Sequence, residues 1–161
     1  MTLQESRAAM LHFSENYTKA REQHPQLPPL EELDSEFDTL ELVGREKIFP
    51  RSVLRYARWQ MMQGVNAWAG YLHGFILPNP QNAASMEEYN FLTDKDKQVL
   101  VDTLNWIMYR NREMNLIQLN EDDGKSVDFI TETLAEWKER KGTIQKLLER
   151  NRDAWKAKLK K

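Results

Sequence analysis

The stretch that decides the fold is SVLRYARWQMMQGVNAWAGYLHGFIL, residues 52–77, the longest run of the chain with helical spacing of apolar side chains. Its apolar residues recur at steps of three or four, which places them on one face of a helix. Pro78 and Pro80 follow, and proline cannot continue a helix because it lacks the amide hydrogen. The sequence therefore predicts a long central helix with one buried face. That face would carry Leu54, Ala57, Met61, Val65, Trp68, Leu72 and Phe75.

The central helix is too polar to cross a membrane. Its most apolar part, residues 65–77, is 13 residues long and includes Asn66 and His73. A spanning helix needs about 20 apolar residues. We therefore expect no membrane partner.

Small residues mark a second face of the central helix: Gly64, Ala67, Gly70 and Gly74. A glycine inside a helix costs about 1 kcal/mol relative to alanine, so these glycines predict that something approaches this face closely. We interpret the face as a site of close helix packing. A ligand pocket beside residues 64–74, in a small-molecule-binding protein or an enzyme, is the alternative.

Length and composition predict one folded domain with a hydrophobic core. The chain has 161 residues, of which 30% are charged and 40% hydrophobic, values typical of a soluble globular protein. It contains no cysteine, which excludes disulfides, thiolate zinc sites and cysteine nucleophiles. The first residues lack the basic segment and apolar core of a signal peptide. We therefore expect a cytoplasmic protein.

Charge is distributed unevenly along the chain, although the net charge is only −2. Residues 1–50 and 85–137 carry −5 and −7, whereas residues 51–84 and 138–161 carry +3 and +7. The sequence therefore predicts a basic C-terminal end on an acidic body, a layout that favours acidic partners.

Two further long helices are predicted, over residues 2–23 and 94–119, because apolar side chains recur there at helical spacing. Thr93 and Asp96 have the spacing of a capping box, which would start the second of these helices. Asn111 lies in line with the apolar face of that helix, so it is the polar residue that we expect to be buried.

The segments between the long helices carry weaker signals. Residues 30–43 fit the spacing of a helix and that of a strand, and we prefer a helix closed by Gly44 because no second strand is available for pairing. Ser85 and Glu88 again have capping-box spacing and predict a short helical turn. The predicted fold class is therefore all-α, a single-domain bundle of four main helices plus one or two short helices.

The last predicted helix is the longest and runs from Ser126 to about Lys160, with a regular seam of apolar residues and a potential break at Gly142. We divide the chain into a helical bundle domain, residues 1–141, and a basic C-terminal helical extension, residues 142–161. We expect the extension to continue the last helix and to pair with the first helix. A homodimeric coiled coil is the competing use of the same seam.

No catalytic or cofactor motif occurs in the sequence. The chain contains no Glu-x-x-His, no HExxH, no G-x-S-x-G and no glycine-rich phosphate-binding loop. We therefore expect neither a metal nor another cofactor, assign no catalytic residue, and favour a non-enzymatic function.

Polar side chains on the central helix, together with one on the next long helix, form the candidate ligand pocket. Apolar walls with a few polar groups are typical of ligand sites. An ordinary buried helix whose polar groups are satisfied by its neighbours would look the same. The candidates are Gln60, Gln63, Asn66, His73 and Asn111.

Three arginines at the start of the central helix form a first basic cluster. Arg51, Arg55 and Arg58 are spaced so that they project from one side of the first two turns. With the nearby Tyr56 and Trp59 they would bind phosphate or stack on bases. We favour instead pairing with the acidic side chains of residues 31–41, because these lie just upstream in the sequence.

The C-terminal helix carries a second basic cluster. Its cations would suit an acidic partner or a nucleic-acid backbone, although cations at the end of a helix also complement the helix dipole. The candidate contact residues are Lys146, Arg150, Arg152, Lys156 and Lys158.

The function that we expect from these observations is a non-enzymatic α-helical interaction or adaptor module. It would dock on a protein or nucleoprotein partner with its basic C-terminal helix. The alternatives are the small-molecule-binding protein or enzyme described above and a direct nucleic-acid binder, whose affinity would fall steeply with salt.

Overall fold

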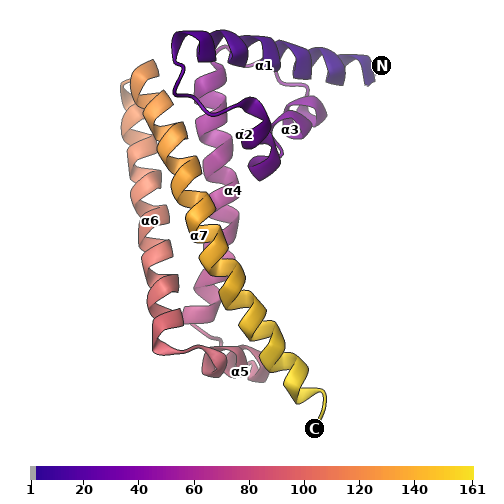
Figure 1. The fold of residues 1–161 in the computed structure, drawn as a ribbon, viewed down its shortest axis with the longest axis vertical. Helices are drawn as coiled ribbons and strands as arrows, with labels where there is room; N and C mark the ends of the chain where they lie inside the picture. Colours follow the sequence, from indigo (N-terminus) through magenta and orange to yellow (C-terminus); the bar gives the residue numbers. More distant parts are fainter. Residues whose placement is uncertain (1–2) are drawn as a thin grey trace. The chain divides into compact units, whose positions relative to one another are not determined.

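The computed structural model describes residues 3–161, and in this part of the chain it consists of seven α-helices without a β-strand (Figure 1). The all-α fold class is therefore confirmed, with the four long helices that the sequence predicts. Three short helices accompany them, where one or two were expected. The helices are α1 (Leu3–Gln23), α2 (Leu30–Phe37), α3 (Thr39–Glu46), α4 (Val53–Ile76), α5 (Ala83–Phe91), α6 (Asp94–Leu119) and α7 (Asp123–Lys158).

The ambiguous segment 30–43 is helical, but it is divided at Asp38. Asp38 has a left-handed backbone, with φ 51° and ψ 39°, and its N–H donates to the carbonyl oxygen of Asp34 at 2.8 Å, which ends α2. The side chain of Asp34 then accepts a hydrogen bond from the N–H of Leu40 at 2.7 Å, in the first turn of α3. Aspartate is among the few residues that tolerate this backbone conformation, so one predicted helix becomes two.

The prediction that Gly44 closes this helix is wrong, because α3 continues to Glu46 and is capped by the left-handed Lys47. Gly44 instead allows close packing against α1. A Cβ atom at Gly44 would lie 2.8 Å from both the sulfur of Met10 and the hydroxyl oxygen of Ser6. The glycine is therefore required by a helix–helix contact and not by a cap.

The chain folds as two compact units. The first comprises the described residues up to Gly64 together with Asn111–Leu134, and the second comprises Val65–Arg110 and Ala135–Lys161. Helices α4, α6 and α7 therefore contribute residues to both units.

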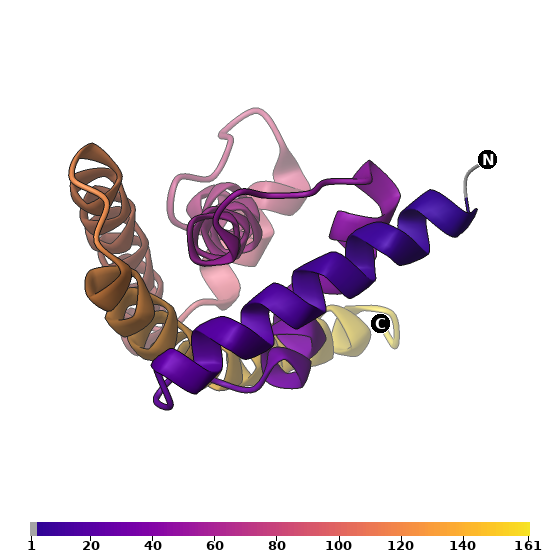
Figure 2. The same ribbon diagram turned by 90° about the horizontal axis from the view of Figure 1, so that it is seen from above.

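In the first unit, α1 lies across α2 and α3 (Figure 2). The side chains of Phe13, Tyr17, Leu33 and Met61 are buried in its core. The Tyr17 hydroxyl donates to the carbonyl oxygen of Pro28 at 2.8 Å, so the proline-rich connector between α1 and α2 is fastened to α1. Burial raises the pKa of Tyr17, which keeps the phenol protonated as a donor.

In the second unit, the antiparallel helices α6 and α7 pack through two tryptophans. The rings of Trp106 and Trp137 are stacked, with centroids 6.3 Å apart and an interplanar angle of 13°. Leu100 and Ile107 of α6 are fully buried with them, as the predicted apolar spacing requires. Burial of several large apolar side chains at about 25 cal/mol per Å² is the main stabilising contribution in such a unit.

The capping prediction for α6 is confirmed, and that for α5 is wrong in detail. The Thr93 hydroxyl accepts from the N–H of Asp96 at 3.1 Å, and the Asp96 carboxylate accepts from the N–H of Thr93 at 3.0 Å. Helix α5 is capped by Asn82, whose side chain accepts from the N–H of Ser85 at 3.1 Å. Ser85 is thus inside the helix and not at its cap.

Helix α7 continues through Gly142 without a break, as the sequence prediction of a continuous last helix requires. Its C-terminal part packs within the second unit. Ile144 and Leu147 are buried, and the indole N–H of Trp155 donates to the Glu88 carboxylate of α5 at 3.1 Å. Helix α1 belongs to the first unit, so the pairing of α1 with residues 142–161 stays a prediction.

Among the described residues, no helix combines the length and the apolarity that crossing a bilayer demands.

Candidate functional sites

The five residues of the predicted ligand pocket are divided between the two units. Gln60 is buried, and its amide N–H donates to the carbonyl oxygen of Phe37 at 3.3 Å. Gln63 is exposed in the same unit, where Asn111 is half-buried. In the second unit, His73 is exposed and Asn66 is half-buried. None of the five lines either of the two cavities described below.

The small-residue face is closely approached at Gly64. A Cβ atom at Gly64 would lie 2.9 Å from the ring of Phe37 in the same unit, so helix packing accounts for this glycine. At Gly70 and Gly74 no atom of the structure lies within 4 Å of an added Cβ. Close packing therefore explains one of the three glycines.

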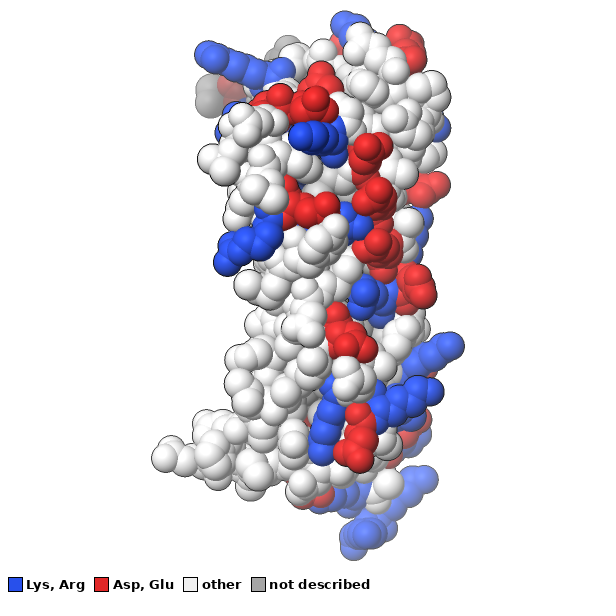
Figure 3. Space-filling view, turned by 90° about the vertical axis from the view of Figure 1, so that its left-hand side faces the viewer, with Lys and Arg blue, Asp and Glu red and all other residues white. Residues whose placement is uncertain are grey.

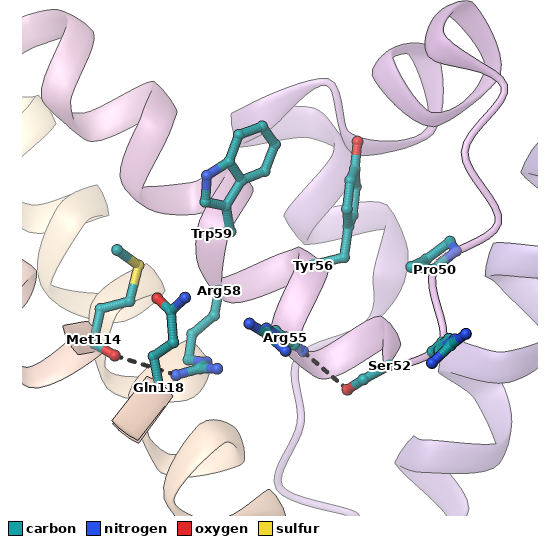
Figure 4. Close-up of a pocket in the computed structure, with 9 residues that line it drawn as sticks. Pro50, Ser52, Arg55, Tyr56, Arg58, Trp59, Met114 and Gln118 are labelled. Atoms are coloured by element: carbon teal, nitrogen blue, oxygen red, sulfur yellow. Dashed lines mark hydrogen bonds between the residues drawn. The ribbon is translucent and has the colours of Figure 1, made fainter. Parts of the chain in front are cut away.

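The three predicted arginines line a single cavity of about 390 Å³, which we call the arginine pocket (Figure 4). Its floor is formed by the first two turns of α4 and by the last turns of α6, all within the first unit. Arg55 and Arg58 lie on one side of the first turns of α4, as their spacing predicts, whereas Arg51 precedes the helix, which begins at Val53. The lining residues used below are Arg51, Ser52, Arg55, Tyr56, Arg58, Trp59 and Gln118.

Arg58 is the buried member of this pocket, with only 1% of its surface exposed. Its Nη2 donates to both carboxylate oxygens of Glu121, at 2.9 and 3.1 Å, and its Nη1 lies 3.4 Å from the carbonyl oxygen of Met114. Its Nε is buried without a hydrogen-bond acceptor. A bidentate pair of this kind is stronger than a single neutral hydrogen bond and fixes the guanidinium plane.

The expected pairing of the arginines with the acidic segment upstream is wrong for two of them. Arg55 lies 3.5 Å from Glu121, the residue that also binds Arg58. Glu121 follows α6 in the sequence and comes from the same unit as α4. The carboxylate that pairs with Arg55 and Arg58 is therefore brought close by helix packing, and it is distant from them in the sequence.

Two aromatic rings form a wall of the arginine pocket. The ring centroids of Tyr56 and Trp59 are 5.8 Å apart, and Tyr56 also contacts the buried Phe13 at 5.7 Å. Burial, and then the nearby Glu46 carboxylate, raise the pKa of Tyr56. Trp59 is 45% exposed, so its ring remains accessible to a ligand.

A second cavity, of about 440 Å³, lies in the second unit between Trp68 of α4 and one face of α7, and we call it the tryptophan groove. Trp68 is predicted to be buried, but it is 39% exposed and lines this groove. On α7 the lining residues recur at helical spacing, so they form one face. They are Trp137, Lys141, Ile144, Gln145, Leu148, Glu149 and Arg152.

Several cations of the C-terminal cluster are paired within the second unit. Arg150 forms an ion pair with Asp96, and Lys158 with Glu87, while Arg152 binds the adjacent Asp153 at 3.0 Å. The side chains of two other cluster members, Lys146 and Lys156, are exposed. Figure 3 shows Lys and Arg side chains gathered at the lower end of the view, where Figure 1 places the end of α7.

The pairing of Arg150 changes the titration of its partner. Burial alone would raise the pKa of Asp96, but the hydrogen bond from the Thr93 backbone, followed by the bond from Arg150, outweighs it and lowers the pKa. Asp96 is 6% exposed. The carboxylate therefore belongs to the structure of the second unit and is occupied by its own neighbours.

One buried arginine was not predicted from the sequence. Arg110 of α6 is 2% exposed and lies 3.0 Å from the Glu136 carboxylate of α7, which also accepts from the indole N–H of Trp106. Burial opposes ionisation of Glu136, but the bonds from Trp106 and then Arg110 prevail and lower its pKa. Apolar residues around position 110 predict a buried helix face there. This was the sequence feature from which the burial of Arg110 could have been inferred.

No group of three or more histidine, aspartate or glutamate side chains that could hold a metal ion occurs within residues 3–161. Comparison of the chain with protein-family models, with curated proteins and with solved structures found no match. The features of the molecule that bear on its function are therefore the arginine pocket, the tryptophan groove and the charges around them.

Proposed function

We propose that this chain is a non-enzymatic α-helical interaction module that docks on a protein or nucleoprotein partner through the basic part of α7. The observation that carries the proposal is the tryptophan groove, an apolar hollow whose α7 side bears cations. Trp68, Ile144 and Leu148 supply apolar surface. The charged residues of the lining are Lys141, Arg152 and one carboxylate, Glu149.

The occupant that fits this groove best is an amphipathic helix with acidic residues beside its apolar face. An apolar groove along a helix is a common receptor for such a segment, which inserts apolar anchors at helical spacing. Residues 138–161 carry ten basic and three acidic side chains, and Asp96 and Glu87 of the same unit pair with two of the basic ones, which leaves an excess of positive charge. This excess of positive charge would attract an acidic segment and orient it.

Only part of the basic cluster would contact this occupant. An α-helix turns by about 100° per residue, so Lys156 falls on the side of α7 that bears Lys141 and Arg152. Lys146 falls on the other side. Tryptophans and arginines commonly contribute most to binding energy. In this groove we expect Trp68 and Arg152 to make the largest contributions to the affinity for the occupant.

The proposal is tested by capturing partners from an extract of the source cells with the full chain and with charge-reversed variants. The double variant Arg152→Glu/Lys156→Glu should weaken binding of the captured protein roughly tenfold, since each lost exposed ion pair contributes about 0.2–1 kcal/mol and repulsion adds to the loss. The matched control Lys125→Glu/Lys146→Glu changes the same charge on α7 outside the groove and should bind as the unchanged chain does.

Equal losses in the two double variants would contradict docking at the groove. Loss of capture after nuclease treatment, with direct binding of the chain to the released nucleic acid, would favour the nucleic-acid binder instead. Deletion of residues 142–161 is a poorer test because it would remove the buried Ile144 and Leu147 and would unfold part of the second unit.

A further inference from the structure

We propose that the arginine pocket binds a small ligand of the mononucleotide class, with its phosphate on Arg51 and Arg55 and its planar ring against Trp59. This proposal concerns the first unit and is independent of docking at the tryptophan groove. It rests on the charge of the pocket, on the arrangement of its charged and aromatic sides, and on its size.

The lining of the pocket carries an excess of positive charge. Three guanidinium groups line it, and the Glu121 carboxylate pairs with two of them, those of Arg55 and Arg58. Arg58 is occupied by both oxygens of Glu121, whereas Arg51 has no ion-pair partner among residues 3–161. Asp123 lines the adjacent cavity beside Arg51 and reduces the excess there without removing it.

The exposed arginines are suited to a phosphate group. A planar guanidinium donates two parallel hydrogen bonds to phosphate oxygens, which lysine cannot do. Arg55 has 56% of its side chain exposed, so its guanidinium remains accessible. The Ser52 hydroxyl accepts from the N–H of Arg55 at 3.2 Å, which leaves its own hydrogen for a phosphate oxygen.

The aromatic side of the pocket is suited to a planar ring. In Figure 4, Arg55 lies between Trp59 on one side and Ser52 on the other. A ligand with a ring at one end and a phosphate at the other would match this order. Stacking on an accessible aromatic face tolerates any base, since every base presents a flat face, while the Gln118 amide offers a donor and an acceptor to the ring edge.

The size of the pocket favours a small molecule over a polymer. Its volume of about 390 Å³ lies within the range of about 300–1,000 Å³ that small-molecule sites have. Arg58 contributes a buried positive charge and, through its ion pair with Glu121, connects α4 to the segment after α6. Arg51 and Arg55 would contact the phosphate of the ligand directly.

The test is calorimetric titration of the full chain with AMP, GMP, UMP, adenosine and inorganic phosphate, together with NMR of the Trp59 indole N–H. The signal is assigned by its loss in Trp59→Phe. We expect saturable one-to-one binding of mononucleotides, at least about tenfold tighter than that of adenosine or phosphate, with a shift of the Trp59 signal. A tenfold change corresponds to about 1.4 kcal/mol.

Three variants make the test specific. Arg51→Ala/Arg55→Ala should lose at least about tenfold in affinity, and Arg55→Lys should lose part of it because the fork geometry is lost while the charge is kept. Arg112→Ala removes an exposed arginine of the same unit outside the pocket and should bind normally. All these arginines are exposed, so the variants should fold.

The proposal is overturned by failure of every mononucleotide to bind at millimolar concentration, or by binding that leaves the Trp59 signal unchanged. It is also overturned if Arg112→Ala loses as much affinity as the double variant, which would indicate a general charge effect. The proposal is likewise overturned if single-stranded RNA binds more than tenfold tighter than any mononucleotide, because the pocket would then be part of a polymer site.

Discussion

Arg58 and Glu121, 63 residues apart in the sequence, form a bidentate ion pair with N–O distances of 2.9 and 3.1 Å. The two partners differ in burial, since 2% of the Arg58 side chain and 39% of the Glu121 side chain are exposed. The pair fastens the first turns of α4 to the segment between α6 and α7 inside the first unit. It thereby sets the floor of the arginine pocket.

Because Arg58 is the buried partner, neutralising Glu121 is predicted to lower the stability of the protein. Glu121→Gln would leave the buried Arg58 charge without its counter-charge, and we expect it to lower the free energy of unfolding by about 1–3 kcal/mol. Adding Arg58→Met to Glu121→Gln should recover part of that loss because the unpaired charge is then gone. Urea denaturation of both single variants and the double variant measures this coupling, and strictly additive losses would argue against the pair.

The ion pair of Asp96 with Arg150 predicts a pH dependence of stability. The pKa of Asp96 is lowered in the folded protein, so its contribution is present above the pKa of the unfolded chain and is lost as the pH falls through the folded pKa. Asp96→Asn should therefore lower stability at neutral pH and make no difference in strong acid. Thermal unfolding across this pH range measures the effect.

The control for that series is Asp128→Asn, which removes an exposed carboxylate outside the capping box. Its stability difference from the unchanged chain should vary little with pH. A pH dependence of Asp96→Asn that matched this control would mean that the carboxylate is not held by the Thr93 N–H and Arg150.

The two kinds of glycine in α4 predict opposite responses to alanine. Gly70→Ala should stabilise by about 0.5–1 kcal/mol, because alanine favours the helix and nothing lies within 4 Å of the added atom. Gly64→Ala should lose this gain or destabilise by up to about 2 kcal/mol, since its Cβ would lie 2.9 Å from the Phe37 ring. Chemical denaturation compares the two variants, and an equal gain in both would show that Phe37 does not press on α4.

The sequence predicted elements that depend on local spacing. The buried face of α4 is as expected for six of its seven residues, with the exception of Trp68, and the capping box of Thr93 and Asp96 is present. The grouping of Arg55 and Arg58 on one side of α4 was also predicted, although Arg51, which was assigned to the same turns, precedes the helix. Each follows from the geometry of one helix, in which residues three and four apart are neighbours.

Features that depend on a distant segment could not be predicted. Glu121 as the partner of the α4 arginines and Glu136 as the partner of Arg110 both require knowledge of which helices pack together. Glycine is common at helix ends, which is why Gly44 was predicted to end a helix. In the structure it is needed because Met10 and Ser6 of α1 leave no space for a Cβ atom. A single sequence gives the face of a helix but not the surface that will cover it.

The exposure of Trp68 shows the same limit within α4. Its position in the apolar stripe predicts burial, and it does contact the Trp137 ring of α7, with centroids 6.5 Å apart. Periodicity assigns it to the correct face, but the neighbouring helix leaves a groove beside it. A residue that the pattern places in the core thus becomes the apolar wall of a candidate docking surface.

The measurement that tests docking most directly is photo-crosslinking from the groove. A photoreactive amino acid replaces Gln145, which lines the tryptophan groove, or Thr143, which is exposed about 200° around the same helix. We predict that the chain labelled at position 145 attaches to an acidic amphipathic segment of a partner protein, and that the chain labelled at position 143 does not. Equal yields from both positions, or products containing only nucleic acid, would contradict the proposed function.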